Sequence, residues 1–176
     1  NVPDAWHQLA RIDFLRGNFS DAMEKINKQI EIHGDSLMAS YYIRGLINGY
    51  AGNLVEAEAD FKKFLNWDKT DWAAHNDLAW VYFMRGDYKK LEIISRQGLY
   101  FNKNNPWLLI SLGASLLNQG KKNEAKEIFE KAKIAAAALK EKDWNKAYPG
   151  NDPRVALGAL EAMKKTIEYN LKLSKE

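Results

Sequence analysis

Large and small apolar residues recur along the chain at fixed distances from four glycines. These glycines are spaced 35, 34 and 34 residues apart: Gly17, Gly52, Gly86 and Gly120. Seven residues before each lies a small residue: Ala10, Gly45, Ala79 and Gly113. Eleven before each the residues are larger: Trp6, Tyr41, His75 and Leu109. This alternation predicts pairs of antiparallel helices that approach closely, with the glycine ending the first helix of each pair.

The same pattern predicts the helix boundaries. Four pairs are expected at about 4–16 with 19–33, 38–51 with 54–67, 71–85 with 88–101, and 106–119 with 122–141. A polar loop over 146–151 then leads to a ninth helix over 153–173, and no segment has the alternation of a strand. A repeat of this length cannot bury its apolar face alone, so successive pairs are expected to stack into a solenoid.

At these offsets the chain resembles the tetratricopeptide-repeat (TPR) family over about residues 3–135. Repeats two and four carry the family pattern best, through Tyr41, Gly45, Gly52, Ala57 and Phe61, and through Leu112, Gly113, Gly120, Ala125, Phe129 and Ala132. Repeat three departs from the pattern at Leu91, Ser95 and Gly98, which suggests altered packing there. The resemblance implies an all-α, right-handed α-solenoid of four TPR-like helix pairs plus a C-terminal capping helix.

The expected domain boundaries follow from the repeats. Residues 1–145 form four repeats, at about 3–37, 38–71, 72–105 and 106–145, and residues 146–176 form a loop and the capping helix. That last helix has one apolar stripe, made of Ala156, Leu160, Met163, Ile167 and Leu171. The stripe is expected to cover the last exposed core of the array. The alternative is a helix that binds a partner or a second copy of the chain.

Composition narrows the possible functions. The 176 residues are 46% hydrophobic and contain no cysteine, which excludes disulfides, thiolate catalysis and Cys-based zinc sites. Residues 131–176 hold ten Lys/Arg against six Asp/Glu, whereas residues 1–130 are close to neutral. A neutral repeat body disfavours nucleic-acid binding, and no apolar run, that at 134–139 included, is long enough to span a membrane. Because the chain begins at Asn1 rather than Met, we expect it to belong to something longer, in which an upstream anchor has room.

No catalytic or metal-binding constellation is visible. The three histidines, His7, His33 and His75, lie in different repeats, and His75 occupies a position where other repeats place packed residues. The segment Asp68–Asp71 begins like a calcium loop but lacks the glycine and glutamate of one. No glycine-rich loop is followed by the Lys-Ser/Thr of a phosphate site. We therefore predict a protein that is not an enzyme and has no catalytic residues, metal or cofactor.

The first helices of the pairs are expected to line a concave side. Residues ten, six, three and two before each glycine share one helical stripe, which is rich in aromatic residues. The predicted partner-binding residues are Arg11, Phe14, Tyr42, Leu46, Gly49, Tyr50, Asn76, Trp80, Phe83, Met84, Trp107 and Ile110. Gly49 is expected to leave a notch among the aromatics. The alternative is that part of this stripe packs between first helices, or against the C-terminal segment folding back.

These observations predict a non-enzymatic protein–protein interaction module that binds a peptide or helix of a partner in an aromatic-rich groove. TPR domains that hold a C-terminal carboxylate use basic residues, but this chain has Ala73 and Asp77 at two of those positions, so an acidic C-terminus is a poor ligand. One alternative is a self-assembling scaffold in which the groove accepts another copy's terminal helix. RNA binding is less favoured, because Arg11 alone brings positive charge to the stripe. The compartment, cytoplasmic or extracytoplasmic, is left open.

Overall fold

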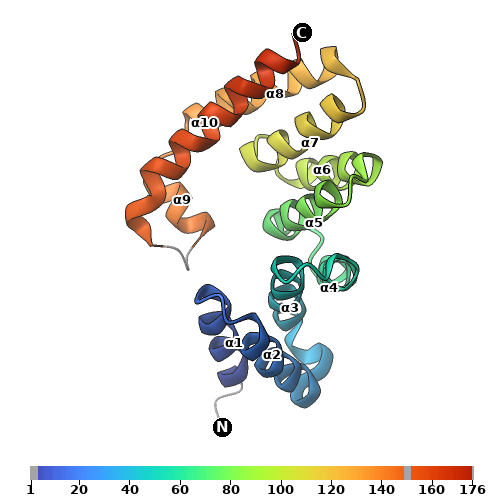
Figure 1. Ribbon diagram of the computed structural model, residues 1–176, viewed down its shortest axis with the longest axis vertical. Coiled ribbons are helices and arrows are strands. Elements are labelled where there is room, and N and C mark those ends of the chain that lie inside the picture. Colours follow the sequence, from blue (N-terminus) through green and yellow to red (C-terminus); the bar gives the residue numbers. More distant parts are fainter. Residues whose placement is uncertain (1–3, 149–151, 176) are drawn as a thin grey trace. The chain divides into compact units, whose positions relative to one another are not determined.

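The computed structural model describes residues 4–148 and 152–175, and regular structure within these ranges is helical throughout. Among these residues there are ten α-helices, two short 3₁₀ turns and no strand (Figure 1). The α-helices are α1 (Ala5–Leu15), α2 (Phe19–His33), α3 (Ala39–Tyr50), α4 (Leu54–Trp67), α5 (Trp72–Met84), α6 (Tyr88–Phe101), α7 (Pro106–Asn118), α8 (Lys122–Ala137), α9 (Glu141–Ala147) and α10 (Ala156–Leu173). The predicted all-α fold is confirmed.

One predicted helix is shorter than expected. The helix predicted over 122–141 ends at Ala137, and Lys140 has an extended backbone. There the carboxylate of Asp143 accepts a hydrogen bond from the backbone N–H of Lys140 at 2.9 Å, at the start of the separate helix α9. The loop expected from Lys146 therefore begins inside α9, and its residues 149–151 lie outside the described residues.

The four period glycines have the same conformation and the same hydrogen bonds. Gly17, Gly52, Gly86 and Gly120 have φ values of 78°, 87°, 69° and 75°. Each glycine N–H donates to the carbonyl three residues earlier, and the next N–H donates to the carbonyl five residues earlier, at 2.8–3.1 Å. This pairing satisfies carbonyls that the helix end would leave open, and it needs a left-handed residue. The sequence period therefore marks a repeated backbone structure.

The chain forms two compact units, Asn1–Val81 (unit 1) and Tyr82–Glu176 (unit 2), so that α5 contributes to both. In unit 1, α1 packs against α2 and α3, and α3 packs against α4. A core cluster there contains Ala10, Ala22, Ile26, Ile43 and Ile47. An ion pair also ties α3 to α4, because Arg44 donates two hydrogen bonds to Asp60, at 2.7 and 2.9 Å.

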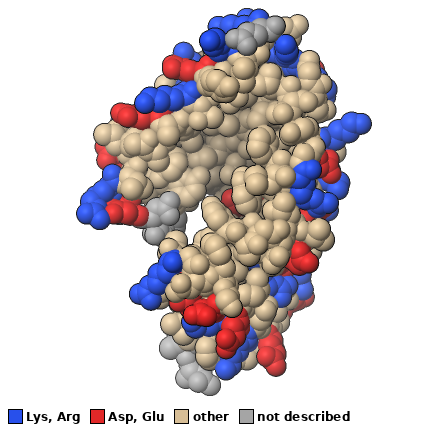
Figure 2. All heavy atoms as spheres, viewed as in Figure 1, with Lys and Arg blue, Asp and Glu red and all other residues tan. Residues whose placement is uncertain are grey.

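In unit 2, α6 packs against α7, α7 against α8, and α10 against α8 and α9 (Figure 1). Met163, Ile167 and Leu171 of α10 share a core cluster with Phe129 and Ala132 of α8. The apolar stripe of the last helix thus covers the core of the fourth helix pair, as the capping interpretation predicted. In Figure 2 the charged side chains of this unit lie around its outer edges, while the hollowed face between α10 and α7 is almost wholly uncharged.

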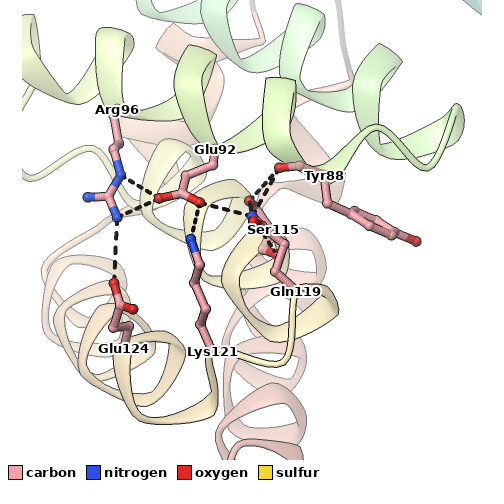
Figure 3. A network of polar contacts seen from close by, with 7 residues as sticks. All are labelled: Tyr88, Glu92, Arg96, Ser115, Gln119, Lys121 and Glu124. Carbon is pink, nitrogen blue, oxygen red and sulfur yellow. Dashed lines mark hydrogen bonds and ion pairs between the residues drawn. The ribbon is translucent and has the colours of Figure 1, made fainter.

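A polar network around Glu92 joins the third and fourth helix pairs within unit 2 (Figure 3). The Glu92 carboxylate on α6 accepts hydrogen bonds from Lys121 at 2.8 Å, Gln119 at 2.9 Å and Arg96 at 2.9 Å. Gln119 and Lys121 belong to the turn between α7 and α8, so the carboxylate ties α6 to that turn. These bonds lower the pKa of Glu92 to about 2, and the bond from Lys121 has the largest effect.

Candidate functional site

The predicted partner-binding residues all lie on the first helices of the pairs. Unit 1 holds those of α1 and α3 and the beginning of α5, and unit 2 holds those of the last turn of α5 and of α7. In unit 1 they are Arg11, Phe14, Tyr42, Leu46, Gly49, Tyr50, Asn76 and Trp80, and in unit 2 they are Phe83, Met84, Trp107 and Ile110.

Three aromatic rings of unit 1 form a continuous set, which we call the aromatic ladder: Phe14, Tyr50 and Trp80. The ring of Tyr50 stacks on that of Trp80, with centroids 5.5 Å apart and planes 25° apart. The ring of Phe14 meets that of Tyr50 edge to face at 5.3 Å, and the ring of Phe19 on α2 lies 6.4 Å from it. Tyr50 is nevertheless 61% exposed. Residues from three successive first helices, α1, α3 and α5, thus present one aromatic surface to solvent.

The notch expected at Gly49 is not open. A Cβ atom built on Gly49 would lie 3.0 Å from Cζ3 of Trp80, so the indole ring already occupies this space. The glycine therefore lets Trp80 approach the backbone of α3 closely. The expectation of a notch was wrong because the position of a ring on α5 is not encoded in the pattern around Gly49.

Tyr42, a predicted partner-binding residue, belongs partly to the core, in line with the alternative that part of the stripe packs inward. Its ring packs against those of Phe61 at 5.8 Å and Phe64 at 5.2 Å. Its hydroxyl donates a hydrogen bond of 2.6 Å to Oδ2 of Asp77 on α5. Burial raises the pKa of Asp77 to about 7; the hydrogen bond from Tyr42 opposes this rise, and the nearby charge of Asp71 adds to it.

The remaining predicted residues of unit 1 are polar or partly buried. Arg11 is half-buried and bonds Gln8 on its own helix at 3.1 Å. His7, one helical turn before Arg11, lies 3.3 Å from the Ser40 hydroxyl, and its pKa is lowered mainly by burial and also by Arg11. Leu46 packs against the core cluster of unit 1, and Asn76 is half-buried. His75 is buried, as predicted.

In unit 2 the C-terminal segment covers part of the predicted stripe. Trp107 of α7 meets Trp144 of α9 at 6.0 Å and Tyr148 at 6.1 Å. Ile110 packs against the core cluster of this unit. The alternative that the C-terminal segment folds back onto the stripe therefore holds for Trp107. Phe83 and Met84 remain exposed, at 44% and 55%.

Two kinds of site find no support among the described residues. Within residues 4–148 and 152–175, no three His, Asp or Glu side chains lie together as metal ligands would. In the same ranges, no helix combines the length and the apolar character needed to cross a bilayer.

Comparison with known proteins agrees with the repeat analysis. The tetratricopeptide-repeat family model matches residues 108–133, which run from α7 into α8. No curated protein matches the chain in sequence. Among solved structures, the MamA protein superposes with a TM-score of 0.70 at 17% identity, over 98% of this chain and 88% of that one. This chain has the TPR fold.

Two further TPR-like structures support this assignment. YrrB, described as a TPR protein with an unusual peptide-binding site, has a TM-score of 0.65 at 20% identity, covering 98% of this chain and 84% of that chain. PilF of Pseudomonas aeruginosa has a TM-score of 0.66 at 18% identity, covering 97% and 90%. TPR folds in general mediate protein–protein interactions, through surfaces that the stacked helix pairs leave open.

Proposed function

We propose that this TPR chain is a non-enzymatic interaction module that binds an extended peptide or a helix of a partner protein on the aromatic ladder. The observation that carries the proposal is the position of Tyr50. Its ring is fixed between Phe14 and Trp80, yet it is 61% exposed. Exposed, rigidly held aromatic side chains are the residues that dominate binding energy in protein interfaces.

The ring contacts also favour binding through preorganisation. Trp80 is held by its stack on Tyr50 and by its close approach to Gly49. Because the side chains of the ladder are already held in place, binding a ligand restricts them little further. This lowers the entropic cost of binding. A peptide of alternating apolar side chains, or the apolar stripe of a helix, suits such a surface.

The alternative of a self-assembling scaffold, in which the groove accepts another copy's terminal helix, is less favoured. The apolar stripe of α10 that would insert into another copy is buried against α8 within the same unit. A second copy would have to use other residues of α10, such as Leu157 and Tyr169, which are exposed. We therefore favour a partner of a different sequence.

The proposal is tested by selecting random dodecapeptides displayed on phage against the immobilised chain. The Tyr50→Ser variant should lose at least about tenfold in affinity for the selected peptides, the loss typical of a hot-spot aromatic. Tyr100→Ser is the matched control, because Tyr100 is 77% exposed and lies on the second helix of a pair. Peptides that bind Tyr50→Ser as tightly as the unaltered chain, or failure to enrich any peptide, would contradict the proposal.

A further inference from the structure

The Asp77 carboxyl lies in unit 1 beside the aromatic ladder. Asp77 and Trp80 are three residues apart on α5 and therefore share a face of that helix. The carboxyl points toward α3, where Oδ2 accepts the hydrogen bond from the Tyr42 hydroxyl. Tyr42 and Tyr50 are eight residues apart on α3, so they too share a helix face. The carboxyl and the ladder are thus parts of one surface formed by α3 and α5.

No Lys or Arg side chain in the described part of the chain pairs with the Asp77 carboxyl. Two buried Asp side chains of unit 1 have a cation beside them: Asp13 pairs with Lys25, and Asp60 pairs with Arg44. The ion pairs within residues 4–148 and 152–175 do not include Asp77, whose one polar partner there is the neutral phenol of Tyr42. Arg11, the arginine of the predicted stripe in unit 1, bonds Gln8 on its own helix.

A half-buried carboxyl without a cation is unfavourable in its charged form, and burial accordingly raises the pKa of Asp77. A cation brought by a ligand removes this penalty, because the ion pair forms where much of the water is already excluded. The neighbouring rings favour the same ligand, since the faces of Trp and Tyr attract ammonium and guanidinium groups. An anionic ligand group would be repelled here.

We propose that Asp77 selects a lysine or arginine side chain in the peptide that binds on the aromatic ladder. This inference rests on the proposed function and adds the chemistry of the ligand. The aliphatic part of the basic side chain packs along the rings of Tyr50 and Trp80, and its charged end reaches the carboxyl that Tyr42 orients. The partner segment is therefore basic and apolar, the opposite of an acidic C-terminus.

The experiment repeats the dodecapeptide selection on the unaltered chain and on Asp77→Asn. Asparagine keeps an oxygen that accepts the hydrogen bond from Tyr42 and removes the charge. Peptides selected on the unaltered chain should carry Lys or Arg at one position, and those selected on Asp77→Asn should not. A selected peptide and its copy with norleucine for lysine, or citrulline for arginine, should differ at least tenfold in affinity for the unaltered chain and less than threefold for Asp77→Asn.

Glu56→Gln is the matched control, because it removes one negative charge from an exposed position on α4 and should keep the basic preference. If peptides bind in a Tyr50-dependent manner but lack a basic position, or keep it on Asp77→Asn, the inference about Asp77 is overturned and the proposed function stands. If no peptide is enriched on the unaltered chain, the proposed function fails and this inference fails with it. Equal thermal unfolding of the variants establishes that the comparison concerns binding.

Discussion

Gly113 on α7 lies directly beneath the ring of Phe129 on α8. A Cβ atom built on Gly113 would lie 2.6 Å from Cε1 of that ring, closer than real side chains approach. Gly45 and Phe61 have the same relationship in the second repeat, at 2.9 Å. In the first repeat the same two positions hold Ala10 and Ile26, both fully buried. The small residue and its partner are therefore matched in size within each of these pairs.

This matching predicts the effect of adding one methyl group. Gly113→Ala should lower the free energy of unfolding by about 1–3 kcal/mol, because overpacking a tight contact outweighs the better helix propensity of alanine. Gly158→Ala, on α10, is the control: no atom lies within 4 Å of its would-be Cβ, so it should raise stability by up to about 1 kcal/mol. Urea unfolding of both variants measures the difference.

The size match is tested by a double-mutant cycle. Phe129→Ile recreates the combination found at Ala10 and Ile26, so adding it to Gly113→Ala should cost less than the sum of the two single changes, by about 1 kcal/mol or more. Strict additivity of the two changes would show that the ring and the glycine are not matched.

Much of the fold could be predicted because its signals are local. Each period glycine, such as Gly52, sits at a left-handed position that a side chain would strain, and the apolar offsets around it define two helix faces. Helix α9 was missed because it is short and depends on the cap at Asp143 and on contacts of Trp144 with Trp107. Neither the cap nor the ring contact recurs along the sequence with the repeat, so the repeat pattern does not predict this helix.

The candidate site was less accessible to sequence reasoning for a similar reason. The stripe offsets identified Tyr50 and Trp80, but not that the ring of Trp80 fills the space above Gly49. The hydrogen bond between Tyr42 and Asp77 joins residues 35 positions apart on different helices. Such contacts depend on how the helix pairs stack. The type of each residue does not predict them, because a Tyr, Trp or Asp at these positions is also compatible with a core or a solvated face.

The Glu92 network predicts a loss of stability on substitution. Glu92→Gln should lower the free energy of unfolding at pH 7 by about 1–2 kcal/mol, a figure reduced because Lys121 and Arg96 are partly exposed. The folded pKa of about 2 lies below the ordinary 4.5, so the contribution is complete above about pH 4.5 and is lost as the pH falls toward 2. Unfolding curves at pH 7 and pH 3 should therefore show a smaller difference at pH 3.

Glu124→Gln serves as the control for this network. Glu124 is largely exposed and lies 3.9 Å from Arg96, so its substitution should change stability by less than about 0.5 kcal/mol. An effect of Glu92→Gln no larger than that of Glu124→Gln would contradict a tie between α6 and the turn that follows α7.

Asp77 predicts the opposite dependence on pH. Its folded pKa of about 7 lies above the ordinary 3.8, so the folded state holds a proton that the unfolded state has lost, and stability falls as the pH rises from about 4 to 7. Asp77→Asn cannot ionise and does not lose this stability. The free energy of unfolding of the variant, relative to the unaltered chain, should therefore be about 1–2 kcal/mol higher at pH 8 than at pH 5. Urea unfolding at the two pH values measures it, and an effect of the substitution that is independent of pH would show that the carboxyl ionises normally in the folded protein.

Two buried serines, Ser95 and Ser115, differ in whether their hydroxyls are satisfied. Both are fully buried; Ser115 Oγ donates to the Tyr88 carbonyl at 2.9 Å and accepts from Gln119 at 3.0 Å, whereas Ser95 Oγ has no hydrogen-bond partner among the described residues. Ser115→Ala should lower the free energy of unfolding by about 1–2 kcal/mol, because it leaves Gln119 and the Tyr88 carbonyl with fewer bonds. Ser95→Ala should instead raise it by about 0.5–1 kcal/mol, because it removes a hydroxyl that lost its water on folding and gained nothing in return. Thermal and urea unfolding of the two variants should therefore shift in opposite directions, and destabilisation by both would show that the Ser95 hydroxyl does have a partner in solution.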